Sequence, residues 1–408
     1  MGQTPCDLHF SIIIAFIAKL ADQIQFFETV PVVSVESLNV LLSITSGSML
    51  GVATFAVGSM LTAYSSASNS ATPRSFPLII ADDVSQNALS SFIGAFIFSI
   101  VAYVALENGY YGPAGRFILF IMSIVVFAII ILNFIRWLDR IARLGRLGNT
   151  IDKVENVTRE SLLRRRKKPT LGAKPALGSE PKGTPIYARS VGYVQRIDIP
   201  ILQNIAENTN SEIMILSQPG AFTFPDQPLA YIMKEQKSDK KEIDFAEIEA
   251  AFIIAKDRAF DEDPRFGLVV LAEIASRALS AAVNDPGTAI DIIGSFVRIF
   301  TLWSEVDEDE IDKDLAFDRV SIPQLSLDDM FDDAFNVIAR DGAGTIEVAL
   351  RLQKAFRSLA SLDVPNIKEV SKAHAQIAFR YAEKSLTLDE EIKLLKKEVS
   401  FVNANLVY

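Results

Sequence analysis

The chain contains few of the residues on which most enzymes and redox proteins depend. Of its 408 residues only Cys6 is a cysteine, and only His9 and His374 are histidines. One cysteine forms neither a disulfide nor a Cys-x-x-Cys pair within a chain, and this set cannot supply a structural zinc site. No G-x-x-x-x-G-K-[ST], G-x-S-x-G or H-E-x-x-H motif occurs either. We therefore expect no catalytic activity, no bound metal and no cofactor.

Charge is scarce in the first third of the sequence. Residues 1–135 hold ten of the 90 charged side chains, although half of the whole chain is hydrophobic and its formal net charge is −10. A soluble domain carries about 25% charged residues throughout. A membrane-like first third joined to a water-like remainder excludes a purely soluble enzyme, a disordered protein and a secreted disulfide scaffold.

Long uncharged runs predict the membrane spans. Residues 88–106 and 117–135 are two such runs of nineteen. As helices each would measure about 28 Å, close to the bilayer core of about 30 Å. A third span is predicted within residues 38–64. Because the uncharged run continues to Pro73, we expect this helix to protrude from the membrane.

The first segment, residues 10–27, carries a weaker signal. Lys19 and Asp22 interrupt it, and a charge at a helix centre costs about 2.5–3.5 kcal/mol on insertion scales. The two charges lie three positions apart and could pair on one helix face. Both a span and an interfacial helix remain open for this segment.

Basic residues after the last span predict the orientation. Residues 136–168 contain eleven basic and four acidic side chains, and the positive-inside rule places such a segment in the cytoplasm. With four spans, both termini would lie inside. The same basic stretch could also bind anionic lipid headgroups, or it could be a topology signal alone.

The remainder of the chain predicts an acidic soluble region. Residues 169–408 carry a net charge of −13, which argues against nucleic-acid binding. A proline- and glycine-rich linker at 169–185 precedes a β-rich segment at 186–233. After Asp244, apolar residues recur at helical spacing in seven segments, at 245–256, 266–282, 288–303, 326–340, 344–362, 367–383 and 388–401.

The predicted fold class is an α-helical membrane protein with a cytoplasmic α+β domain. Transmembrane helical hairpins come first, followed by a small β-module and a helical bundle. The expected boundaries are 1–37 for the first span and an external loop, 38–146 for transmembrane helices two to four, 147–185 for a basic helix and linker, 186–240 for the β-rich module and 241–408 for the bundle.

Several short motifs resemble a known bacterial family. They are Gly47-Ser48-Met49, Thr72-Pro73-Arg74, Gly192-Tyr193-Val194-Gln195-Arg196-Ile197-Asp198, Pro219-Gly220-Ala221-Phe222, Phe266-Gly267, Arg277-Ala278-Leu279-Ser280, Asn284-Asp285-Pro286 and Thr288-Ala289. In order and spacing the chain resembles the predicted membrane proteins grouped as domain of unknown function 2254 (DUF2254), from about Leu38 onward. Members usually have Pro-Gly-Asp-Phe where this chain has Ala221. The resemblance implies four spans in a bacterial inner (plasma) membrane, a cytoplasmic C-terminal domain and no settled activity.

A stripe of small and polar residues marks the second span. Its members recur at spacings of three and four, which places them on one face of a helix: Gly47, Gly51, Thr54, Gly58, Thr62, Ser65 and Asn69. Two interpretations are open, close helix packing and a water-filled path within an oligomer. At the inner mouth, Arg74 faces Asp82 and Asp83, either as an ion pair that pins the loop or as a charge ring that biases permeation.

A polar motif in the soluble region is the second candidate site. It comprises Arg258, Asp263, Arg277, Asn284 and Asp285. Carboxylates and amides ligate hard cations, so an ion or a nucleotide could bind here. Helix capping and salt bridging would explain the same residues without a ligand.

Together these features predict a homo-oligomeric inner-membrane protein in contact with lipid. The second span would line a channel or channel-like path, and the cytoplasmic domain would assemble and gate it. The alternative is a membrane-anchored scaffold or sensor whose cytoplasmic domain binds a partner, an ion or a small ligand without conduction.

Overall fold

The computed structural model describes residues 31–80, 83–176, 183–234, 243–306, 315–362 and 364–402. The chain divides into two compact units, residues 1–150 and 151–408. The weak first segment, residues 10–27, lies outside the described residues, and so does Asp82.

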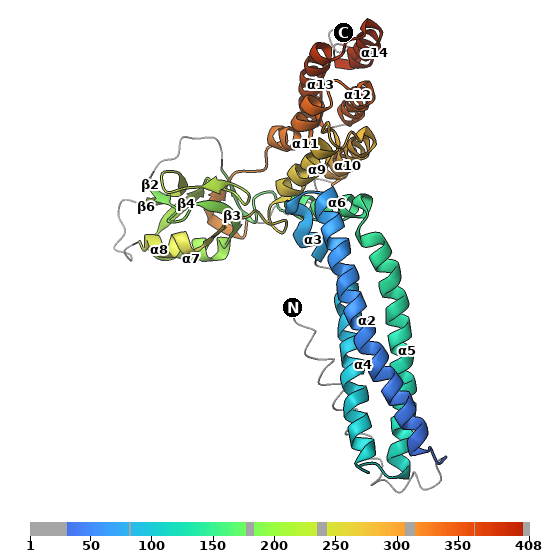
Figure 1. The fold of residues 1–408 in the computed structure, drawn as a ribbon. Helices are drawn as coiled ribbons and strands as arrows, with labels where there is room; N and C mark the ends of the chain where they lie inside the picture. The colour runs from blue at the N-terminus through green and yellow to red at the C-terminus, as the bar shows by residue number, and fades with distance from the viewer. Residues whose placement is uncertain are drawn as a thin grey trace. The chain divides into compact units, whose positions relative to one another are not determined.

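Three long apolar helices form the described part of the N-terminal unit (Figure 1). They are α2 (Val35–Ser70), α4 (Asp83–Glu107) and α5 (Pro113–Leu144), with the short helices η3 (Pro73–Ser75) and α3 (Phe76–Ile80) between α2 and α4. Each of the three is long and apolar enough to cross a bilayer. The spans predicted from the three uncharged runs are confirmed as helices of spanning length.

Helix α2 is longer than a bilayer requires. Its 36 residues correspond to about 54 Å. The Ser34 hydroxyl caps its start by accepting from the Ser37 N–H at 3.1 Å, and the helix ends at Ser70, just before Pro73. The extension past residue 64 agrees with the length of the uncharged run.

The three spans pack together through apolar side chains. Met49 and Ala56 of α2 meet Phe92 of α4 and Trp137 of α5 in one buried cluster. The ring centroids of Phe92 and Trp137 lie 6.4 Å apart, nearly at right angles. Many Ile, Val and Leu side chains of these helices are instead exposed, Leu132 among them, as expected for surfaces that contact lipid.

The strands of the C-terminal unit form two sheets. The larger has the order β1 (Ala173–Pro175), β8 (Phe317–Ile322), β4 (Ser211–Ile215), β6 (Pro228–Lys234) and β2 (Thr184–Tyr187). Strand β8 runs parallel to β1 and β4, and the other pairs are antiparallel. The smaller, antiparallel sheet has the order β5 (Phe222–Thr223), β3 (Gly192–Ile197) and β7 (Phe252–Ala255).

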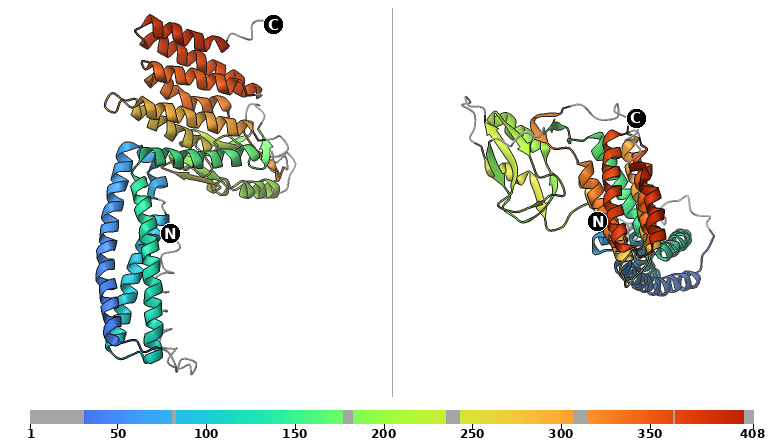
Figure 2. Two further views of the ribbon diagram at one scale, coloured as in Figure 1. Left: turned by 90° about the vertical axis from the view of Figure 1, so that its right-hand side faces the viewer. Right: turned by 90° about the horizontal axis from the view of Figure 1, so that it is seen from above.

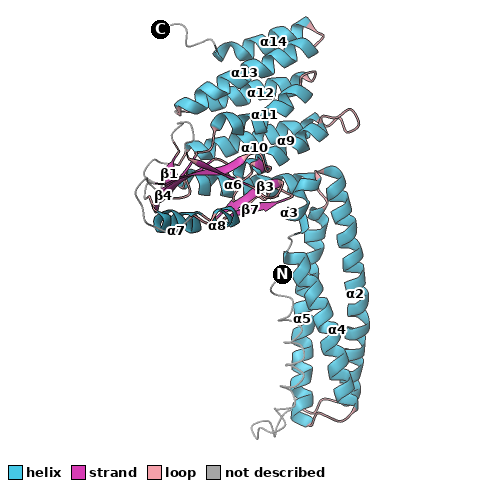
Figure 3. Ribbon diagram, turned by 90° about the vertical axis from the view of Figure 1, so that its left-hand side faces the viewer, coloured by secondary structure: helices cyan, strands magenta, loops and turns pink. Residues whose placement is uncertain are grey.

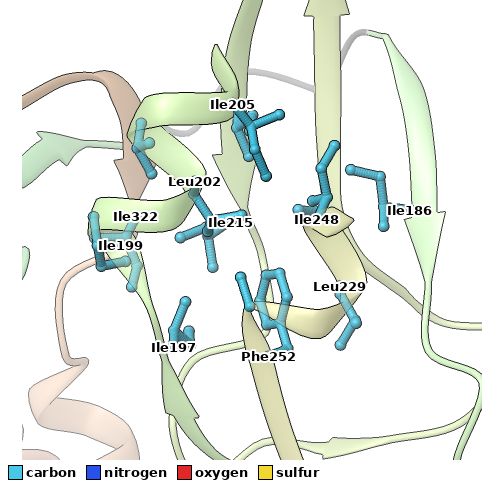
Figure 4. Close-up of a cluster of buried hydrophobic side chains, with 14 of the residues drawn as sticks. Ile186, Ile197, Ile199, Leu202, Ile205, Ile215, Leu229, Ile248, Phe252 and Ile322 are labelled. Atoms are coloured by element: carbon cyan, nitrogen blue, oxygen red, sulfur yellow. The ribbon is translucent and has the colours of Figure 1, made fainter. Parts of the chain in front are cut away.

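One apolar core joins both sheets to the helices α7 (Ile199–Thr209) and α8 (Phe245–Ala250) (Figure 4). Ile215 and Ile322 from the larger sheet meet Leu202 of α7, Ile248 of α8 and Phe252 of β7, all of them buried. We call this part, with its two sheets and two helices, the β-module.

Six further helices stack in two layers (Figures 2 and 3). In one layer, α11 (Leu327–Asp341) contacts both α9 (Pro264–Ala278) and α13 (Pro365–Ser385). In the other, α12 (Ile346–Ala360) contacts α10 (Pro286–Ser304) and α14 (Asp389–Val399), which the short η5 (Ser400–Val402) follows. The expected helical bundle takes the form of a stack, in which the main contacts within each layer join helices two apart in the chain.

Aromatic rings fill the interior of this helical stack. Phe300 of α10 and Phe331 of α11 have centroids 4.4 Å apart, and Phe335 of α11 lies 4.8 Å from Phe356 of α12. All four side chains are fully buried. Phenylalanines therefore tie consecutive helices together.

The β-module draws on more of the chain than residues 186–240. Strand β1 lies inside the segment expected to be a linker, and β8 follows α10, inside the segment expected to be helical. The apolar run after Ala251 is strand β7 rather than the end of a helix, and α7 occupies part of the expected β-rich segment. The helices expected from 266 onward are confirmed, with ends shifted by a few residues.

Candidate functional site

The stripe on α2 lies on the outside of the described three-helix unit. Six of its seven members have exposed side chains or an exposed Cα, namely Gly47, Gly51, Thr54, Gly58, Thr62 and Ser65. The seventh, Asn69, falls within α2, but its side chain lies outside the described part. The buried face of α2 carries Met49, Ala53, Ala56 and Met60. On a helix of 3.6 residues per turn these two sets lie about 180° apart.

The stripe glycines have open space beside them. A Cβ added at Gly47, Gly51 or Gly58 would meet no atom of the described residues within 4 Å. The sequence interpretation of close packing therefore does not apply between α2 and the described helices of the same chain. A packing partner for this face would have to come from another molecule or from residues outside those described.

The threonine hydroxyls of the stripe bond within their own helix. Thr54 Oγ1 donates to the Leu50 carbonyl at 2.9 Å, and Thr62 Oγ1 donates to the Gly58 carbonyl at 3.0 Å. A hydroxyl satisfied in this way tolerates lipid and retains lone pairs that can accept from water or a partner. The hydroxyl geometry is compatible with both stripe interpretations.

A groove borders the stripe toward α5. Its volume is about 680 Å³, and its lining includes Gly58 and Thr62 of the stripe, Ser59 and Ser66 beside it, and Ile141 of α5. Phe55, Ala63, Ala142 and Gly145 complete the lining. One edge of the stripe thus continues into a hollow that is rich in small residues.

The charges expected near the inner mouth are only partly described. Arg74 is exposed in η3, and Asp83 is exposed as the first residue of α4, where a carboxylate favours the helix N-terminus. Asp82 belongs to the undescribed residues. The expected pairing of Arg74 with these carboxylates stays a prediction.

Arg258 and Asp263 from the soluble motif form a buried ion pair. Arg258 Nε and Nη2 donate to the two Asp263 oxygens at 2.6 and 2.9 Å, and Asp263 also accepts from the Phe266 N–H as the N-cap of α9. Asp263 is only 1% exposed. Burial raises the pKa of this carboxyl, and the bonds from Arg258 oppose that shift.

The turn at Gly220 closes over this carboxylate. Gly220 has φ +93°, and a Cβ there would lie 2.5 Å from an Asp263 oxygen. Both the backbone conformation and the contact require glycine. The motif Pro219-Gly220 is therefore explained by its approach to Asp263.

Arg277, Asn284 and Asp285 lie at the other end of α9. Arg277 is in the last turn of α9, Asn284 adopts φ +50° in the following loop, and Asp285 caps α10 by accepting from the Thr288 N–H and hydroxyl at 3.1 and 2.6 Å. A helix of 15 residues separates the two groups by about 20 Å. The structure does not bring the five motif residues into one site.

Helix α6 (Leu147–Lys167) carries contacts that sequence reasoning missed. Glu155 receives two bonds from Arg298 of α10, at 2.7 and 2.6 Å. Buried Arg165 Nη2 donates to the Gln218 amide oxygen of the β-module at 2.7 Å. The signal was present, because the buried positions of α6 recur at spacings of three and four. The dense basic charge was instead interpreted as a topology signal or a lipid-binding segment.

These features define a multi-pass membrane protein with three candidate spans and a soluble C-terminal α/β region. The chain belongs to the family described as "Predicted membrane protein (DUF2254)", which it matches over residues 8–358. The resemblance drawn from the short motifs is thereby confirmed.

Two relatives are uncharacterized proteins of Mycobacterium bovis and Mycobacterium tuberculosis. Each is 26% identical to the chain over 139 residues, which is 32% of this chain and 26% of the relative. The match thus spans about a quarter of the length of these curated relatives. No solved structure matches the chain.

Proposed function

We propose that the protein is a homo-oligomeric channel or channel-like protein of the bacterial inner membrane. In this proposal the α2 stripes of several copies face one another around a permeation path. The C-terminal unit lies in the cytoplasm, where it assembles and gates the path. No catalytic step is part of the proposal.

One observation carries it: the stripe of small and polar residues occupies the exposed face of α2. A helix face that met only lipid would gain nothing from three glycines with open space beside them. Small residues on a membrane helix let a second backbone approach closely, and a symmetric assembly is the usual way to provide one. Thr62 and Ser65 lie toward the C-terminal end of the span, where a wet vestibule would need polar groups.

The orientation is supported by charge. The segment after α5 carries the basic excess that the positive-inside rule places in the cytoplasm. Helix α6 begins three residues after α5 ends, and from Glu155 onward it bonds both the helical stack and the β-module. In the proposal, α6 is the segment of chain through which the C-terminal unit would act on the last span.

Flux through liposomes tests the proposal. Purified full-length protein is reconstituted and its ion flux is compared with Thr62→Leu and Ser65→Leu. Ser48→Leu is a matched control, because Ser48 is exposed on α2 but lies about 100° around the helix from Gly47. We expect both stripe variants to lower flux strongly while the oligomer mass stays unchanged, and the control to conduct normally.

Two results would contradict it. Flux that is unchanged in both stripe variants would reject the stripe as the lining. A particle that contains a single chain in detergent and in nanodiscs would reject the oligomer.

The open-ended helical stack supports a second candidate, a membrane-anchored scaffold or sensor. Stacked helix pairs present extended surfaces to partners, and Ile377 and Tyr381 of α13 with Leu394 of α14 are exposed apolar side chains on this stack. Full-length protein that conducts nothing, yet retains one defined partner that is lost in Tyr381→Asp, would favour this candidate over the channel.

A further inference from the structure

A cavity of about 650 Å³ lies within the C-terminal unit at the end of α6. Three elements meet there: the last turns of α6, the turn from β3 to α7 and the loop before α9. Four basic side chains line it, namely Arg164 and Arg165 of α6, Lys168 just after α6, and Arg196 of β3. The first three belong to a run of five consecutive basic residues, 164–168.

Neutral groups bind two of these guanidinium groups. Arg164 Nη2 donates to the main-chain carbonyl of Asp261 at 2.9 Å, and Arg165 Nη2 donates to the amide oxygen of Gln218 at 2.7 Å. Neither bond neutralises a positive charge. A negative group in the cavity could therefore add a charge-assisted hydrogen bond to each without displacing a carboxylate.

Arg165 is unusually buried for a cation. It is 4% exposed, and its Nε has no hydrogen-bond acceptor among the described residues. Burial lowers its pKa to about 10, although the charges of Glu262 and Asp263 oppose this. Keeping a guanidinium away from water costs free energy, and an anion in the adjoining cavity would offset part of that cost.

The acidic residues of the lining are partly engaged by the protein itself. Asp198 accepts from the Ile201 N–H as the N-cap of α7, at 3.2 Å. Glu262 pairs with Arg196 at 3.5 Å. Asp261, the third acidic lining residue, is exposed. The cavity thus combines four basic and three acidic side chains, and three of the basic ones lie at the end of α6 or just after it.

Part of the cavity wall is apolar. Ile197, Ile199 and Pro200 from the β3–α7 turn contribute to it, together with Leu171 and Phe317. A fully hydrated inorganic ion would leave this wall unused. An anionic group attached to an apolar or aromatic body fits both sides.

We propose that this cavity binds a small organic phosphate. Its phosphate is held by Arg164, Arg165 and Lys168, and its apolar body rests on Ile199 and Phe317. The planar guanidinium fork matches phosphate oxygens in geometry as well as charge. The ligand is either a lipid with a phosphate headgroup or a soluble nucleotide, since both carry this chemistry. The site goes beyond the proposed function and does not depend on conduction.

Calorimetric titration of the full-length protein in phosphate-free detergent tests the proposal. Three probes separate the sources: adenosine monophosphate for a nucleotide, dihexanoyl phosphatidic acid for a lipid, and inorganic phosphate for the bare anion. We expect one of the two organic probes to bind saturably, with one site per chain and more tightly than inorganic phosphate. The double variant Arg164→Gln/Lys168→Gln should weaken that binding by about tenfold or more, the loss expected when charge-assisted contacts are removed.

Lys167→Gln is the matched control, because it removes one charge from the same basic run at a residue that does not line the cavity. Its affinity should change less than about twofold, as for an exposed charge away from the contact. Should the double variant lose the unfolding transition of the parent protein, the exposed Arg196→Gln tests the same cavity, again with weaker binding expected.

Three outcomes would overturn the proposal. One is no saturable binding of either organic probe at millimolar concentration. Another is equal weakening by Lys167→Gln and the double variant, which would indicate general attraction to a basic surface. The last is unchanged affinity in both Arg196→Gln and the double variant.

Discussion

Gly267 lies where α9 crosses α6, and its replacement by alanine should loosen this contact. A Cβ at position 267 would stand 1.8 Å from Thr158 Oγ1 and 2.8 Å from Thr158 Cβ. Thr158 cannot turn away freely, because its hydroxyl donates to the Val154 carbonyl at 2.6 Å. Overpacking of this kind costs about 1–3 kcal/mol, and we expect the upper end. The better helix propensity of alanine returns about 1 kcal/mol, so the net loss should be about 2 kcal/mol.

Thermal unfolding of the full-length protein in detergent measures this effect. Trp303 of α10 reports on the C-terminal unit, since the guanidinium carbon of Arg166 lies 5.5 Å from the centre of its ring. For a unit of this size a loss of about 2 kcal/mol corresponds to a fall in Tm of about 4–8 °C. Adding Thr158→Ala to Gly267→Ala should recover part of the loss, because it removes the hydroxyl that the new methyl group meets.

Gly294→Ala provides the control within α10. Within the described part of the chain, a Cβ added there would meet only Arg298 Nη1, at 3.5 Å, which is an ordinary contact. The helix-propensity gain should then dominate and raise stability by up to about 1 kcal/mol. A Tm for Gly267→Ala that equals or exceeds that of the parent protein would refute the reasoning, and so would a double variant with no recovery.

Three other predictions concern the same unit. Burial acts to raise the pKa of Glu155, but hydrogen bonds from Arg298 and Ser295 outweigh it and lower the pKa below its usual value of 4.5. The stabilisation from Glu155 is therefore complete above that value and lost as pH falls through the lower folded-state pKa. The difference in the free energy of unfolding between the parent protein and Glu155→Gln, about 1 kcal/mol at neutral pH, should shrink in acid, and a difference independent of pH would count against the assignment. Asp285→Ala removes the cap of α10 and should cost about 1 kcal/mol, whereas Asp285→Asn should cost less; equal losses in a denaturant titration would contradict the capping role. Phe335→Ala opens the ring cluster and should cost about 3–5 kcal/mol, and a loss below 1 kcal/mol in the same titration would show that the cluster closes over the gap.

Elements with a strong local pattern could be predicted from the sequence. The uncharged runs at 88–106 and 117–135 have the length and composition of membrane spans, which helices of soluble proteins rarely show. The helices from 266 onward follow the regular spacing of apolar residues. Strand β1 gave no such signal, because it has three residues within a proline- and glycine-rich segment and pairs with β8, more than 140 residues away. Strand β7 could not be predicted either, because four apolar residues after a short helix fit both the spacing of a helix and that of a strand.

The candidate site was predictable in composition but not in placement. Spacing alone put Gly51 and Thr62 on one face of a helix, yet it could not indicate whether that face met α4 and α5 or pointed away from them. The soluble motif shows the opposite case. Asp263 and Asp285 were assigned to one motif in the sequence, but in the structure Asp263 caps α9 and Asp285 caps α10. Arg165 could not be singled out from the sequence, because residues 164–168 are all basic. In the structure its burial distinguishes it from these neighbours.

The return of β8 to the larger sheet has a practical consequence for dissecting the protein. Because β8 lies between β1 and β4, the stretch that includes α9 and α10 is an insertion within the β-module rather than the start of a separate domain. A fragment cut at residue 240 would lack β8, the strand that joins β1 to β4 in the larger sheet, and would leave the edge of β4 at Ile213 without its partner. Any soluble piece intended to fold by itself must begin before Ala173 and continue beyond Ile322, so it must include the first two helices of the stack.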